Sequence, residues 1–181
     1  FGTLCTTARA ESYATLVESY STVNADGDCL VNLTVTLHLD NSGGEMFFPL
    51  PANATDITMN GSSAKTTKTA DAIQVDISKV TSGLMGDFTL RFDYTIPGAV
   101  KVKTTEPKTD EEKENWVPLE MTLPLLNGFA YPIKNLQFVV VMPTLIQYRP
   151  VFTSIYRQNS IASDLKINYD GSMLTGTSIT T

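Results

Sequence analysis

The sequence predicts an all-β protein, an antiparallel β-sandwich of the immunoglobulin-like or a related type. Several stretches alternate between apolar and polar residues, which is the period of a strand with one buried face. Turn-forming pairs such as Asn60-Gly61 and Pro97-Gly98 separate these stretches. No segment of about 12 residues shows a helical period of apolar residues. Short strands joined by regular turns are typical of a sandwich.

The first two strands are predicted on either side of "NADGDC", residues 24–29. The stretch "CLVNLTVTLHLD" (29–40) alternates strictly, and "YATLVESYSTV" (13–23) is rich in β-branched and aromatic residues. A calcium loop flanked by helices needs glycine at its sixth position and glutamate at its twelfth. Counted from Asn24, glycine stands fourth and Val35 stands twelfth. Asp26-Gly27 therefore predicts the tight turn of a hairpin.

Further strands are predicted along the rest of the chain. They are "AIQVDIS" (72–78), "DFTLRFDYTIPG" (87–98), "PLEMTLPL" (118–125), "NLQFVVVMP" (135–143) and "DLKINYDG" (164–171). The first two alternate, so each is expected to bury one face. The stretch 135–143 is almost continuously apolar after Gln137, which predicts a central strand covered on both faces.

Composition and charge exclude several classes of function. The 181 residues include 42% hydrophobic and only 18% charged side chains, and the formal net charge is -6. Binding to nucleic acid needs clustered Lys and Arg, so no nucleic-acid partner is expected. No run of about 18 apolar residues is present, so any contact with a membrane would be made through segments outside these residues.

The residues needed for familiar catalytic and metal sites are missing. His38 is the only histidine, and it falls on the polar face of the strand 29–40. No G-x-S-x-G motif accompanies it. One histidine and two cysteines cannot complete a structural zinc tetrad, and no glycine-rich phosphate loop occurs. We therefore expect a non-catalytic protein, with no catalytic residue, cofactor or metal ion.

Two surfaces are candidates for contact with a protein or glycan partner. Residues 104–115 form an acidic insertion, predicted to be a solvated loop without a metal site, with contact to a partner as the alternative. Trp116 follows it, either as an anchor for the partner or as part of the core. The second surface mixes aromatic and cationic side chains, as interfaces often do. It contains Tyr148, Arg149, Phe152, Tyr156 and Arg157.

The N-terminal segment and the cysteines bear on the location of the protein. Residues 1–12 contain Ala8-Arg9-Ala10, the small-x-small form that precedes signal-peptide cleavage. This segment is thus the tail of a secretory signal or an ordinary N-terminal segment, and residues 13–181 form a single domain. In an oxidising compartment Cys5 and Cys29 could form a disulfide. The alternative for Cys29 is a buried thiol, because it shares the inward parity of Val31.

Four stretches carry a resemblance to a known family. They are "FFPLPANATDITMNG" (47–61), "LRFDYTIPG" (90–98), "PLLNGFAYPIKNLQFVVVMP" (124–143) and "YDGSMLTGT" (169–177). Together they resemble, over residues 13–181, the extracellular β-domain of bacterial predicted membrane proteins catalogued as domain of unknown function 2207. The resemblance implies a signal peptide upstream, transmembrane helices downstream, and a piece cut from a longer membrane protein. It brings no catalytic residue.

The resulting expectation is a non-catalytic, envelope-facing domain that senses, binds or spaces. It would lie at the cell surface, anchored by transmembrane segments outside these residues. The alternative is a surface carbohydrate-binding or adhesive module. In that case exposed rings of Trp116, Tyr148 and Tyr156 would form the binding platform.

Overall fold

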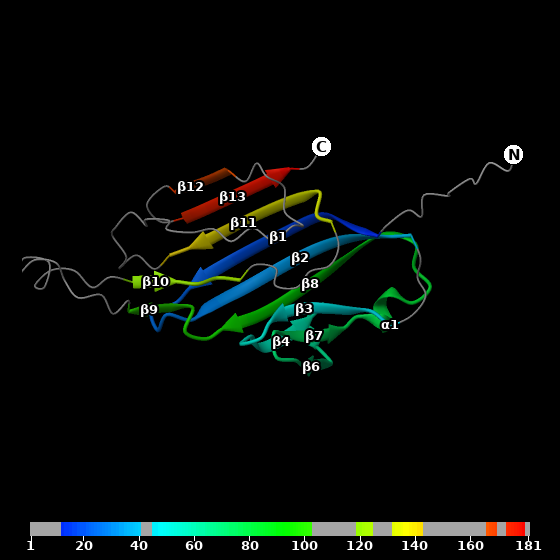
Figure 1. The fold of residues 1–181 in the computed structure, drawn as a ribbon, viewed down its shortest axis with the longest axis horizontal. Helices are drawn as coiled ribbons and strands as arrows, with labels where there is room; N and C mark the ends of the chain where they lie inside the picture. Colours follow the sequence, from blue (N-terminus) through cyan, green and yellow to red (C-terminus); the bar gives the residue numbers. More distant parts are fainter. Residues whose placement is uncertain are drawn as a thin grey trace, which may run out of the picture.

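The computed structural model describes residues 12–40, 45–102, 119–124, 132–142, 166–169 and 173–179, and these residues are mostly β (Figure 1). Within the described residues the only helix is α1 (Ser78–Thr81), a single turn. The prediction of a β-rich chain is therefore confirmed.

One large sheet dominates the structure. Its eight strands, in sheet order, are β12 (Lys166–Tyr169), β13 (Met173–Ile179), β11 (Asn135–Val141), β1 (Tyr13–Val23), β2 (Cys29–Leu39), β8 (Gly86–Ile96), β4 (Thr55–Met59) and β5 (Ser62–Ser63). All neighbouring strands pair antiparallel except β1 and β11, which run parallel. The sheet is therefore mixed, where the sequence predicted a purely antiparallel one. The difference arises because hairpin signals report only strands that are joined by short turns, and β11 is far from β1 in the chain.

In the part of the chain that the structure describes, two smaller sheets accompany the large one. The strands β3 (Phe47–Pro51), β7 (Ala72–Asp76) and β6 (Thr66–Lys68) form a three-stranded sheet with β7 in the middle. The strands β9 (Val100–Val102) and β10 (Leu119–Met121) form a two-stranded ribbon. In Figure 1 the three-stranded sheet lies near β8 and β4, and the ribbon lies near the β1–β2 turn.

The turn between β1 and β2 is the one that the sequence predicted at 24–29. The side-chain oxygen Oδ1 of Asn24 accepts hydrogen bonds from the backbone N–H groups of Asp26 (3.0 Å) and Asp28 (2.9 Å). Gly27 has φ +85, a conformation that glycine adopts without steric cost. The carboxylate of Asp28 accepts a hydrogen bond from the backbone N–H of Gly98 at 2.8 Å. The side-chain oxygens of Asn24 and Asp28 therefore act as hydrogen-bond acceptors within the fold.

The core lies between the large sheet and the three-stranded sheet. The inward residues of β2, β7 and β8 are buried as their alternation predicted, although Phe88 is only partly buried. Phe48 of β3 stacks on Phe92 of β8, with ring centroids 4.5 Å apart. Both rings are almost fully buried. This contact joins the two sheets across the core.

The prediction that 135–143 is covered on both faces is wrong for β11. Leu136, Phe138 and Val140 are buried, whereas Gln137 is exposed and Val139 is only partly buried. β11 has neighbours on both edges but faces the core on one side only. Its run of valines therefore reflects a preference of β-branched residues for strands rather than burial on both faces.

Candidate functional site

The outer face of the large sheet, turned away from the core, carries a shallow open groove. The groove has a volume of about 320 Å³ and spans β1, β2, β8 and β4. Its outward-facing lining includes Tyr20, Leu30, Asn32, Asp56, Thr58 and Asp93. The ring of Tyr20 and the aliphatic side chain of Leu30 face water, since Tyr20 is 53% exposed and Leu30 is 51% exposed.

Strand register explains why these side chains meet. Tyr20 pairs with Asn32, Asn32 pairs with Asp93, and Asp93 pairs with Thr58. These four residues therefore form one row across the sheet, with neighbouring strands about 4.8 Å apart. Leu30 lies in the next row, two residues along β2. An aromatic ring and a carboxylate thus stand on the same face, two strands from each other.

The carboxylate of Asp93 is oriented through one of its oxygens. The side-chain amide of Asn32 donates a hydrogen bond to Asp93 Oδ1. The guanidinium of Arg91 donates to the same oxygen at 3.3 Å. Neither contact uses Oδ2, and the Asp93 side chain is 39% exposed. A ligand in the groove therefore meets a carboxylate that the protein already holds in place.

Asp56 lies at an irregularity of the β4 strand. The register between β4 and β8 shifts between Thr55 and Thr58. Asp56 there has φ 54, a left-handed conformation in which Asp and Asn are enriched among non-glycine residues. Its Oδ2 accepts a hydrogen bond from the hydroxyl of Thr55 at 3.1 Å. The bulge thereby adds a second exposed carboxylate to the lining of the groove.

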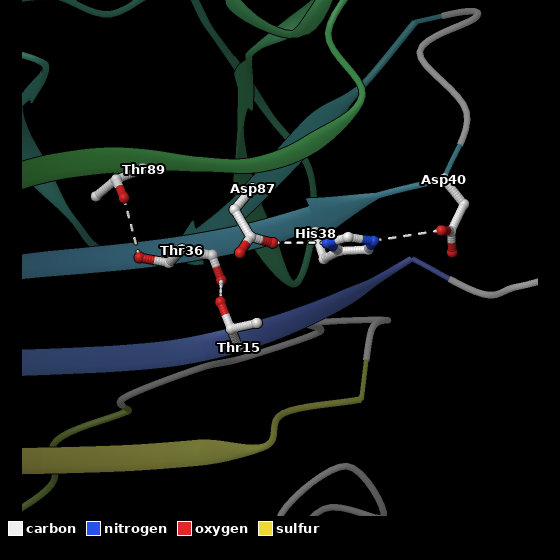
Figure 2. A network of polar contacts seen from close by, with 6 residues as sticks. All are labelled: Thr15, Thr36, His38, Asp40, Asp87 and Thr89. Atoms are coloured by element: carbon white, nitrogen blue, oxygen red, sulfur yellow. Dashed lines mark hydrogen bonds and ion pairs between the residues drawn. The ribbon is translucent and has the colours of Figure 1, made fainter.

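A second polar cluster surrounds His38 near the other end of β2 (Figure 2). The imidazole Nδ1 lies 2.6 Å from Asp87 Oδ1, and Nε2 lies 3.4 Å from Asp40 Oδ1. A neutral imidazole donates at one nitrogen only, so both contacts are hydrogen bonds only when the ring is protonated. Tyr13 stacks on the imidazole at 4.9 Å, and the ammonium of Lys134 lies 3.6 Å from the centroid of the Tyr13 ring.

Hydroxyl groups continue this cluster along the sheet. Figure 2 shows the hydroxyl of Thr15 donating to the backbone oxygen of Thr36, at 3.1 Å. The hydroxyls of Thr36 and Thr89 are 3.0 Å apart. The cluster therefore links β1, β2 and β8 on their outer face, as a cross-strand ladder does. As predicted, His38 lies on the polar face of its strand.

Most of the candidate residues from the sequence lie outside the described residues. This applies to Cys5, to the loop 104–115, to Trp116, and to the second surface with Tyr148, Arg149, Phe152, Tyr156 and Arg157. These proposals of partner contacts, and the disulfide, stay predictions.

Cys29 is described, and its thiol is buried in the core. Burial raises the pKa of this thiol, and a hydrogen bond with the Ser21 side chain acts in the opposite direction. The thiolate is the reactive form of cysteine, so both burial and the raised pKa slow its reactions.

Sequence reasoning did not select Tyr20 and Leu30. Their signal was present, because each falls at an outward position next to polar outward residues of the same strand. Tyr20 alternates with Glu18 and Thr22, and Leu30 precedes Asn32 at the same parity. An apolar residue at such a position is exposed if the strand has one buried face.

Within the described ranges, no group of three or more His, Cys, Asp or Glu side chains is placed to hold a metal ion. None of the helical residues that the structure describes is part of a helix long and apolar enough to cross a membrane.

Comparison with known proteins gives structural matches only. No family model matches the chain, and no curated protein matches it. Among solved structures, it is similar to an M1 zinc metallopeptidase of Deinococcus radiodurans, with 12% identity and a TM-score of 0.42. The match covers 94% of this chain and 39% of that chain. A mutant of this peptidase bound to a Tyr-Ser-Ala substrate matches with a TM-score of 0.43 and 12% identity, over 93% of this chain and 39% of that one.

Proposed function

We propose that this chain is a non-catalytic binding domain of a bacterial membrane protein, exposed on the outer side of the cell envelope. Transmembrane segments outside these 181 residues would hold it there. The observation that carries the binding role is the groove on the outer face, where Tyr20 and Leu30 are exposed beside Asp93. Exposed apolar side chains gathered in a hollow with a few polar groups are typical of binding surfaces.

The location rests on composition and on the resemblance to the bacterial membrane-protein family. Few side chains are charged, and the sequence is rich in Thr, Ser and Asn, as in many extracellular β-domains.

As part of this proposal, the fold is a β-sandwich related to the immunoglobulin type. The stacking of Phe48 on Phe92 supports two packed layers. The parallel pairing of β1 with β11 argues against a purely antiparallel arrangement.

The surroundings of His38 support a non-catalytic role. A general base must have a free ring nitrogen within hydrogen-bond reach of the proton that it removes. Both nitrogens of His38 face carboxylates, Asp87 on one side and Asp40 on the other. This arrangement fits a cross-strand tie better than a proton acceptor.

A carbohydrate-binding or adhesive surface module is the second candidate. The observation that favours it is Tyr20, an exposed ring in an open groove beside amide and hydroxyl groups. Such a ring offers a sugar an apolar face, and the polar groups around it offer hydrogen bonds.

The outer location can be tested on intact cells of the native host that produce the full-length protein. A membrane-impermeant amine reagent should modify Lys68 and Lys101, whose side chains are exposed. Modification of these lysines only after lysis of the cells would contradict the proposed location. A protein of the cytoplasm, probed in parallel, shows that the cells stayed intact.

The non-catalytic assignment can be tested with the purified protein and a panel of hydrolase substrates. We expect no turnover above that of the buffer. Turnover that disappears in His38→Ala, with unfolding behaviour unchanged, would show that the protein is an enzyme. Binding of a neutral oligosaccharide that is lost in Tyr20→Ala would favour the second candidate.

A further inference from the structure

We propose that the groove on the outer face binds a cationic segment of a partner protein, through Arg or Lys side chains that contact the ring of Tyr20 and the carboxylate of Asp93. This inference deepens the proposed binding role by naming the chemistry of the partner. It rests on the composition, charge and register of the groove.

The charge of the groove is of one sign. Among the residues that the structure describes, two carboxylates line it, those of Asp56 and Asp93, and no Lys, Arg or His does. Arg91 contacts Asp93 from outside the groove and does so through Oδ1, so Oδ2 remains for a second cation. The whole chain has a net charge of -6, which adds a longer-range attraction for a basic partner. The chemistry that complements this surface is therefore cationic.

The apolar side of the groove also suits a cationic side chain. A guanidinium or ammonium binds the face of an aromatic ring within about 6 Å of its centroid. The stems of Arg and Lys are aliphatic and pack on exposed apolar groups such as Leu30. Tyr20 and Leu30, both about half exposed, supply these two contacts.

Register sets the spacing that the partner must match. Tyr20 and Asp93 lie in one row with Asn32 between them, so their backbones are about 10 Å apart. Alternate side chains of an extended peptide leave the same face about 7 Å apart. Two cationic residues separated by one other residue can therefore reach the ring and the carboxylate together. Guanidinium is favoured over ammonium, because its planar fork binds a carboxylate oxygen and also stacks on a ring.

A neutral glycan would use the groove less completely. It could stack on Tyr20 and bond to the amide of Asn32, but it would leave the charge of Asp56 and Asp93 without a counterion from the ligand. A glycan is therefore an alternative that the experiment must be able to reveal.

The test is a titration of the purified protein with labelled hexapeptides at about 0.15 M salt. The probes alternate glycine with arginine, with lysine, or with glutamine as the neutral control, and a neutral hexasaccharide is a fourth ligand. We expect the arginine peptide to bind best and the glutamine peptide not to bind. Asp93→Asn and Tyr20→Ala should each weaken binding about tenfold, whereas Tyr20→Phe should retain most of it.

The matched control is Glu45→Gln, which removes one exposed negative charge outside the groove. It should change the affinity less than twofold. Equal weakening in Glu45→Gln and Asp93→Asn would overturn the proposal, because it would show diffuse attraction to the net charge. Absence of peptide binding, or binding of the hexasaccharide alone, would also overturn it.

The result of the peptide titration can be distinguished from the result of the experiment that tests the proposed location. Asn has the shape of Asp and can still accept the Asn32 hydrogen bond, so Asp93→Asn should fold. Asp56→Asn, at an exposed site, is a second variant with the same expected direction. Labelling of intact cells tests the location independently of any ligand, so either result can fail while the other stands.

Discussion

The turn between β1 and β2 should not tolerate a side chain at Gly27, and Gly61 offers a matched control. Both glycines have positive φ, +85 and +76 respectively. A Cβ built at Gly27 would lie 2.8 Å from the backbone oxygen of Val100. The same atom at Gly61 would meet nothing within 4 Å. The difference between Gly27→Ala and Gly61→Ala therefore isolates the contact with β9.

The magnitudes follow from two separate costs. A left-handed conformation costs a residue with a Cβ about 1–2 kcal/mol, and loss of glycine freedom in the unfolded chain returns about 0.4–1 kcal/mol. Gly61→Ala should therefore destabilise by about 1 kcal/mol. At Gly27 the contact must be relieved by moving β9, which adds about 1–3 kcal/mol, as overpacking does.

Movement of β9 away from the turn would also disturb an existing bond. The N–H of Val100 donates to the backbone oxygen of Gly27 at 2.9 Å, so the turn and β9 are held together at this point. Urea unfolding of the two variants and the wild type measures the difference in the free energy of unfolding. If Gly27→Ala loses no more stability than Gly61→Ala, the contact with β9 does not constrain the turn, and the reasoning fails.

Four further predictions concern the core, an ion pair, the thiol and the acidic loop. Phe48→Ala should lower the free energy of unfolding by about 3–5 kcal/mol, because it removes a buried ring that stacks on Phe92. The control Phe47→Ala changes a side chain that is 45% exposed, so it should lower the free energy of unfolding much less. Equal losses in urea unfolding would contradict the packing of the two sheets. The hydrogen bond from Lys65, with those from the side chain and backbone of Ser78, holds the pKa of Asp76 at about 2. The ionised Asp76 carboxylate therefore contributes its full stabilisation of the fold above the pKa of the unfolded state, about 3.9. This stabilisation disappears as the pH falls toward the pKa of the folded state. Unfolding followed from pH 5 to pH 2 should therefore be steeper for the wild type than for Asp76→Asn, and parallel curves would refute the role of the carboxylate. Cys29 should react with a thiol reagent slowly in the native protein and quickly in urea, and two thiols titrated under denaturing, non-reducing conditions would rule out a disulfide with Cys5. Replacing 104–114 by a short turn should leave the free energy of unfolding nearly unchanged. A stoichiometric calcium heat that disappears when Asp110, Glu111 and Glu112 are removed would show that the loop is a metal site.

The orientation of the groove's side chains could be predicted from the sequence, but their meeting in one groove could not. The parity of Tyr20 and Leu30 already places both on an outward face, and the same parity places Asp93 outward on β8. That these three residues share one groove could not be predicted. These residues meet because β2 pairs with β8 in a register that aligns Asn32 with Asp93. Along the chain, all three strands of the smaller sheet lie between β2 and β8, so no short turn links the two strands.

The sequence by itself determined which residues of β2, β7 and β8 face the core and where the β1–β2 hairpin turns. These features depend on local physics, namely the two-residue period of a strand and the φ that a glycine permits at Gly27. Only the tertiary structure decided that β11 lies parallel beside β1, that its valines are covered on one face, and that Phe48 meets Phe92. The reason is that pairing between distant strands is selected by packing summed over the whole sheet, and no local pattern of residues contains that sum.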